Sequence, residues 1–150
     1  MNAPSDLLKL LAVSQDTVGT AAEDLATFQD ITPFDYIVLS LVLTGTVTAS
    51  SVTLKFVTSD ASNGSSPVTA KDAAGADISA VIATPANGTA IQLVIRNRGL
   101  KKFGSPQIST GGAACDVTCV MNGFGVRDTK EISSHWTGGA GAAVTETAFS

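Results

Sequence analysis

Charged residues are scarce in this sequence. They make up 15% of its 150 residues, whereas typical soluble domains carry about 25%. Because charged residues are depleted at the cores of protein interfaces, a surface so poor in charge is more typical of an assembly subunit than of a free monomer. The formal net charge is −4, and this acidic balance argues against nucleic acid as a general partner.

Groups for catalysis and metal binding are also scarce. The one histidine, His135, lies in the stretch SSHWTGG, and no nucleophile elbow of the G-x-S-x-G type occurs anywhere in the chain. The sequence contains no P-loop and no dinucleotide-binding fingerprint. With His135 as the only imidazole, a metal site would lack ligands. We therefore expect no enzyme, no catalytic residues, no cofactor and no metal site.

The two cysteines, Cys115 and Cys119, are four residues apart in a predicted strand. At roughly 3.3 Å per residue their α-carbons would lie about 13 Å apart, and a disulfide needs less than about 7 Å. The spacing predicts two buried free thiols, which fits a reducing compartment.

Aromatic residues and long apolar runs are few. One Trp, one Tyr and six Phe leave little for the exposed aromatic platforms of glycan-binding modules. The longest apolar run, 36–43, is interrupted by a serine and falls short of the roughly 20 residues of a membrane-spanning helix. The N-terminus lacks the basic and apolar regions of a signal peptide. We expect synthesis in the cytoplasm and no membrane partner.

A β pattern dominates what is present. The stretch Asp35–Ser59 predicts two strands joined through Gly45–Ser50 as the central hairpin of the fold. Since successive strand residues point to opposite faces, each strand offers one continuous apolar row: Ile37, Leu39, Leu41 and Leu43 in the first, and Val52, Leu54 and Phe56 in the second. The other face of the first strand carries Tyr36, Val38 and Val42, so we expect that face to be covered too, by the N-terminal segment or by another subunit.

Further strands are predicted over 78–84, 89–96, 103–110 and 113–122, with turns at 85–88 and 111–112. Residues 60–77 have the composition of a loop, and Pro106 predicts that 103–110 is an edge strand. Short strands separated by turns predict an all-β fold, an antiparallel β-sandwich or jelly roll with extended N- and C-terminal arms.

The two ends are predicted as arms on a sandwich core of residues 35–124. In the N-terminal arm, 1–34, residues 5–14 fit a short helix and a strand about equally well, and Thr20 with Glu23 matches a capping box that favours a helical turn over 20–29. The C-terminal arm, 125–150, has no period and four glycines. It either folds back on its own domain or docks on a neighbouring chain, with Trp136 and Phe149 as the natural anchors.

Charge is unevenly placed along the chain. Residues 1–35 hold six acidic residues and one base, while 96–102 hold four bases, Arg96, Arg98, Lys101 and Lys102, and no acid. These patches are either separately solvated, or they meet across a subunit contact, where they would set register and specificity. The four basic residues, with Trp136 and Phe149, are the candidate partner-binding residues.

Three stretches together resemble a known family. They are LKLLAVSQDTV (8–18) followed by Phe28–Ile31, the pair DYIVLSLVL and SVTLKFVTSDAS, and AIQLVIRNRGLKKFGSPQISTGGAACDVTCVMNGF (90–124). This chain resembles the small β-sandwich or jelly-roll-like cement (decoration) proteins of tailed-bacteriophage capsids. The resemblance covers most of residues 8–124.

The resemblance implies a structural role on the outer surface of the virion. Cement proteins bind the capsid shell as dimers or trimers, bridge neighbouring subunits of the major capsid protein, and stabilise the shell against internal DNA pressure. The implied partners are therefore the major capsid protein and further copies of this chain. The alternative that the residues leave open is a receptor- or glycan-binding β-sandwich module of a phage fibre or tail.

Overall fold

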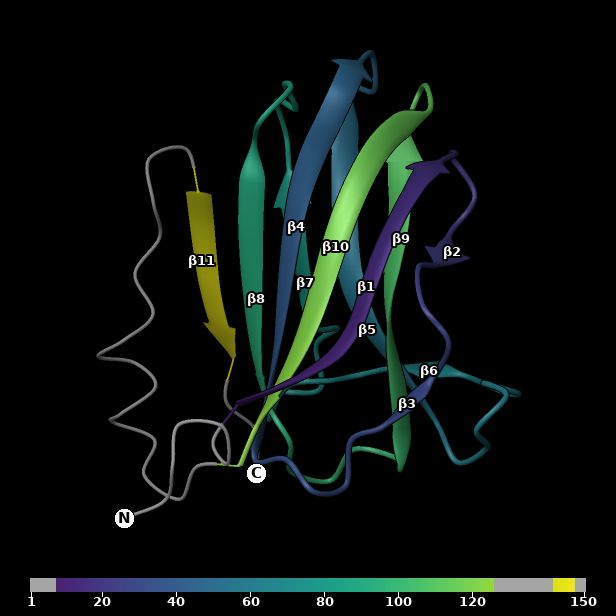
Figure 1. Ribbon diagram of the computed structural model, residues 1–150, viewed down its shortest axis with the longest axis vertical. Coiled ribbons are helices and arrows are strands. Elements are labelled where there is room, and N and C mark those ends of the chain that lie inside the picture. Colours follow the sequence, from purple (N-terminus) through teal and green to yellow (C-terminus); the bar gives the residue numbers. More distant parts are fainter. Residues whose placement is uncertain (1–7, 126–141, 148–150) are drawn as a thin grey trace.

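The computed structural model describes residues 8–125 and 142–147, and all regular structure in these ranges is β-strand (Figure 1). The predicted all-β class is confirmed. The strands are β1 (Leu8–Val18), β2 (Glu23–Asp24), β3 (Gln29–Asp30), β4 (Tyr36–Val47), β5 (Ser51–Ser59), β6 (Val68–Thr69), β7 (Ser79–Ile82), β8 (Ala90–Arg96), β9 (Phe103–Gly111), β10 (Cys115–Phe124) and β11 (Ala142–Thr147).

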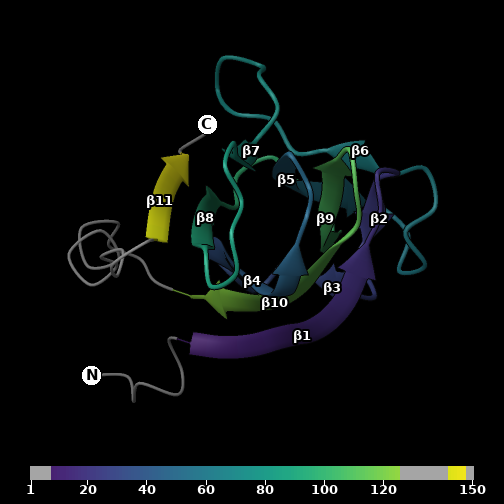
Figure 2. The same ribbon diagram turned by 90° about the horizontal axis from the view of Figure 1, so that it is seen from above.

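The strands form two sheets that face each other (Figure 2). Sheet A has the order β1-β10-β4-β8-β11, and sheet B has the order β2-β9-β5-β6, with β3 also on β9 and β7 also on β5. When the short pairs β2/β3 and β6/β7 are each counted as one interrupted strand, β1 to β10 give the orders 1-8-3-6 and 2-7-4-5. This is a jelly-roll arrangement of a β-sandwich, as predicted.

The predicted central hairpin is not a hairpin. β4 pairs with β10 and β8 in sheet A, whereas β5 pairs with β9, β6 and β7 in sheet B. The chain reverses direction through 48–50, but it passes from one sheet to the other. Both strands carry a continuous apolar row, and the two rows bury more apolar surface by facing each other across the core than by lying side by side. The turns at 85–88 and 111–112 also connect strands of different sheets.

The core lies between the two sheets. Every residue of the two predicted apolar rows is buried there. Phe56 is among the largest fully buried side chains, and its ring lies against Gly104 of β9 so closely that a β-carbon at position 104 would overlap it. The glycine thus leaves the room that the phenylalanine ring fills.

A second, smaller apolar cluster lies on the outer face of sheet A. Tyr36 and Val38 of β4 form it together with Val94 and Phe124, and Val38 is 0% exposed. Coverage of this face was predicted, and Tyr36 and Val38 are indeed buried. Val42 is 37% exposed in the single chain, so its coverage by another subunit stays a prediction.

Residues 8–34 are part of the sandwich, which corrects the predicted N-terminal arm over 1–34. β1 is the strand alternative of the ambiguous stretch 5–14, and it pairs with β10 along its whole length. No helix occurs over 20–29, where β2 and β3 pair with β9. The side chain of Leu25 is buried in the core, so tertiary packing overrides the local capping pattern.

Pro106 does not mark an edge strand, because β9 lies between β5 and the short strands β2 and β3. The Pro106 carbonyl accepts a hydrogen bond from the Leu25 N–H. Since the nitrogen and carbonyl of one strand residue face the same side, the proline nitrogen also faces this side, where the partner strand is interrupted between β2 and β3. A proline is therefore tolerated in β9 because the neighbouring strand is interrupted beside it, and β9 does not have to be an edge strand.

Candidate assembly surfaces

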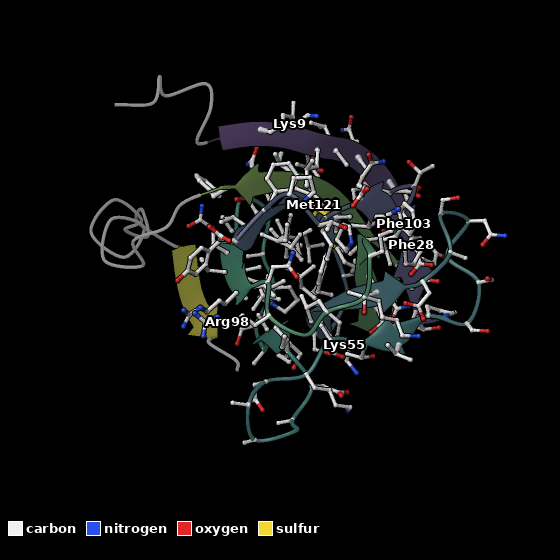
Figure 3. All side chains as sticks on the ribbon, turned by 90° about the horizontal axis from the view of Figure 1, so that it is seen from below. Lys9, Phe28, Lys55, Arg98, Phe103 and Met121 are labelled. Carbon is white, nitrogen blue, oxygen red and sulfur yellow. The ribbon has the colours of Figure 1, made fainter. Side chains whose placement is uncertain are left out.

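The four predicted basic residues gather at one end of the sandwich, in the connection from β8 to β9. Arg96 ends β8, and Arg98, Lys101 and Lys102 follow in the loop. Gly99 has φ +70°, a left-handed conformation that glycine adopts without strain, and it allows the tight turn between them. Figure 3 shows Arg98 at the surface and Met121 in the interior.

Asn97 fixes this basic loop to the segment before β4. Its side-chain amide donates to the carbonyls of Ile31 (2.8 Å) and Phe34 (2.9 Å), and its backbone N–H donates to the carbonyl of Asp35 (2.7 Å). The Ile31 N–H donates to the carbonyl of Lys102 at 2.9 Å. These bonds bring the acidic stretch that ends at Asp35 against the basic loop within one chain.

Part of the basic charge is balanced inside the chain. Lys101 forms an ion pair with Asp60 at 3.1 Å, and Lys102 lies 5.3 Å from the centre of the Phe103 ring. The pKa of Asp30 is lowered mainly by hydrogen bonds from Thr32, with a smaller contribution from the charge of Lys102. Within the described residues Arg96 and Arg98 form no ion pair.

The far edge of sheet A carries a strand that the sequence did not predict. β11 pairs with β8 in parallel, from Ala142 beside Ala90 to Thr147 beside Ile95. All other strand pairs among the described residues are antiparallel. The end of β11 therefore lies beside the residue that precedes Arg96, at the start of the basic loop. Both anchors predicted for this tail, Trp136 and Phe149, lie outside the described residues, as does His135.

Both cysteines are free and buried, as predicted. They lie on the inner face of β10 with Val117 and Met121. Burial raises the pKa of the Cys119 thiol from 9.0 to about 12. The pKa of the Cys115 thiol is also raised, mainly by burial and to a smaller extent by the negative charge of Asp116. These thiols are structural and poor nucleophiles.

The raised pKa of Cys119 predicts a loss of stability at alkaline pH. The pKa of the thiol is near 9.0 in the unfolded chain and about 12 in the folded chain. The contribution of the buried, protonated thiol to the free energy of unfolding is therefore complete below pH 9 and is lost as the pH rises towards 12. One such group changes the free energy of unfolding by at most about 1.4 kcal/mol per pH unit. Urea unfolding at pH 7, 9 and 10.5 should show a steeper decline for the natural chain than for Cys119→Ala. Equal declines would mean that Cys119 ionises freely in the folded protein.

The described residues contain no cluster of three or more His, Cys, Asp or Glu side chains that could hold a metal ion. Of the aromatic side chains between residues 9 and 125, Phe28, Phe34 and Phe103 are half-buried, and Tyr36, Phe56 and Phe124 are buried. In the same part of the molecule, no helix is long and apolar enough to cross a bilayer.

Comparison with known proteins adds little to this picture. No protein-family model matches the sequence, and no curated protein matches it. One solved structure, described as "Bacillus endospore appendages form a novel family of disulfide-linked pili", is similar over 83% of this chain and 96% of that chain, with 14% sequence identity and a TM-score of 0.46. A likeness of this strength carries no argument about what the present chain binds.

Proposed function

We propose that this chain is a capsid cement protein. It binds the outer surface of a tailed-phage head and bridges neighbouring subunits of the major capsid protein, as a homodimer or homotrimer. The resemblance of residues 8–124 to cement proteins supports this role. So do the low content of charge and the absence of clustered catalytic or metal-binding groups in the described part of the chain.

The strand β11 is the observation that carries the proposal, although in the single chain it pairs with its own β8, which is the fold-back alternative expected for this arm. It joins the edge of β8 although residues 126–141 separate it from the rest of the sandwich in sequence. A terminal segment that pairs with a sheet edge is the kind of arm that binds by strand addition, where main-chain hydrogen bonds supply the affinity. On a capsid, such an arm bridges two subunits when it pairs with the edge of a neighbour.

The basic loop supplies a second contact at the same end of the sheet. Arg96 and Arg98 lie next to the end of β11 and form no ion pair among the described residues. Acidic groups on a capsid subunit would pair with them, and such pairs set orientation and binding rate more than affinity.

Binding to shells tests the proposal. Heads of the phage that carries this chain, prepared without it, are mixed with the purified protein, and bound protein is measured by co-sedimentation. Deletion of residues 125–150 is expected to weaken binding at least tenfold, which corresponds to about 1.4 kcal/mol, or one or two backbone hydrogen bonds. Normal occupancy by the truncated chain would rule out the arm as an anchor, and binding to glycans or cells but not to heads would favour the receptor-binding alternative.

Two proline substitutions refine the test. Successive N–H groups of a strand point to opposite edges, so only one of Val144 and Thr145 donates towards β8. On this proposal the arm uses the same backbone edge when it pairs with a neighbour, so of Val144→Pro and Thr145→Pro the proline that removes a donor from that edge should weaken capsid binding more than the other proline does. Val144→Ala and Thr145→Ala are the matched controls and should bind like the natural chain.

A further inference from the structure

The opposite edge of sheet A is formed by a long strand with few of the features that protect an edge. β1 has 11 residues and, within the described part of the chain, pairs only with β10. Figure 2 shows it as the outermost strand of its sheet. Lys9 and Asp16 are its only charged residues. A long strand with unpaired backbone groups along one side is a template for pairing with another chain.

Two large apolar side chains are exposed along β1. Leu10 is 57% exposed and Val13 is 59% exposed. They pair with Asn122 and Val120, which alternate with the buried Met121, so both side chains lie on the outer face of the sheet. Both side chains would become partly buried if another strand paired with this edge.

The charges of β1 complement each other when the strand meets a copy of itself. Consider two copies of β1 that run antiparallel about a two-fold axis at Val13, so that Val13 faces Val13 of the other copy. Ala12 then faces Ser14. Leu11 is the extra residue of the bulge, because Leu10 pairs with Asn122 and Ala12 already pairs with Met121.

Beyond this bulge the register shifts by one residue, which sets Leu10 opposite Gln15 and Lys9 opposite Asp16. Opposed residues of an antiparallel pair lie on the same face. Lys9 pairs with Gly123 and Asp16 with Val117, which share the inner-face register of β10, so the two charges meet on one face. Both side chains are exposed and have no ion-pair partner among the described residues; Figure 3 shows Lys9 at the surface of β1.

We propose that a second copy of this chain binds to the β1 edge. The two β1 strands pair antiparallel about a two-fold axis at Val13, join the two A sheets into one continuous sheet, and form two ion pairs between Lys9 and Asp16. The contact is isologous and closed, so it gives a dimer and not a filament. It does not depend on the proposed capsid role, because it can be measured without capsids.

Cysteine cross-linking tests the register. In this arrangement Val13 faces its own copy at a Cα separation of about 4.5–5.5 Å, which suits a disulfide. The full-length Val13→Cys protein is therefore expected to form a covalent dimer on mild oxidation. Gln15→Cys is the matched control: its two copies lie about 13 Å apart along the strands and should not cross-link. The natural cysteines are buried and serve as an internal background.

Charge exchange tests the ion pairs. Analytical ultracentrifugation of the full chain is expected to give a dimer. Lys9→Asp and Asp16→Lys should each weaken it by about tenfold or more, because each places like charges opposite each other, and the double exchange should restore it. Circular dichroism and thermal unfolding check that each variant folds.

Three outcomes would overturn the proposal. They are a natural chain that is monomeric at millimolar concentration, a trimer, and a dimer that cross-links through Gln15→Cys in place of Val13→Cys. None of these outcomes bears on co-sedimentation with capsids, so failure of the dimer and failure of the cement role are distinguishable.

Discussion

Replacement of Phe56 with alanine is expected to lower the free energy of unfolding by about 3–5 kcal/mol. The ring is fully buried in the core, and β5, which carries it, pairs with β9 on one side and with β6 and β7 on the other. Neighbouring strands therefore cannot collapse into the space that the ring leaves. Urea unfolding measures the loss, and Val81→Ala on the same sheet is the control, since Val81 is 57% exposed and should change stability by no more than about 0.5 kcal/mol.

The same ring predicts an interaction between two substitutions. Gly104→Ala alone is expected to cost about 1–3 kcal/mol, because its methyl group overlaps the Phe56 ring. In the Phe56→Ala background the methyl group enters the vacated space, so the second substitution should cost little or add stability. Gly19→Ala is the matched control, since a β-carbon at position 19 would lie 4.0 Å from its nearest neighbour, a side-chain oxygen of Glu23. Additive losses in the double-mutant cycle would show that the glycine is not there to make room for the ring.

The strands could be predicted from the sequence because alternation of apolar residues reports directly on a buried face. The rows along β4 and β5 identified their core residues correctly. The connections between these strands were harder to predict from the sequence. A turn such as Asn87-Gly88 reports that the chain reverses, and a reversal inside one sheet or between two sheets requires similar local chemistry. The choice depends on what each strand pairs with, and those partners are distant in sequence.

The candidate surfaces show the same limit. The basic loop could be found because its charges are contiguous. Its hydrogen bonds to the segment before β4 could not, since they join Asn97 to carbonyls 63 and 66 residues away. β11 was not predicted because six residues are too few to show an alternating pattern. The only feature that favoured a strand was the β-branched residues Val144, Thr145 and Thr147.

The side chain of Asn97 joins the basic loop to the segment before β4 by two hydrogen bonds. Asn97→Asp is expected to lower the free energy of unfolding by about 2–4 kcal/mol at pH 7, because it removes two donated hydrogen bonds and sets a carboxylate against two carbonyl oxygens. Asn87→Asp is the matched control. Asn87 lies in an exposed turn and makes no side-chain hydrogen bond to another described residue, so its replacement should have little effect.

The loss should depend on pH in a direction that a general surface effect would not produce. Carbonyl oxygens raise the pKa of the introduced carboxyl group in the folded state above its unfolded value of about 3.9. A raised folded pKa means that stability is retained below the unfolded pKa and is lost as the pH rises through the folded one. The deficit of Asn97→Asp relative to the natural chain should therefore shrink between pH 7 and pH 4, where the protonated group donates one bond again. A deficit that stays constant would mean that the amide does not hold the loop by donating to Ile31 and Phe34.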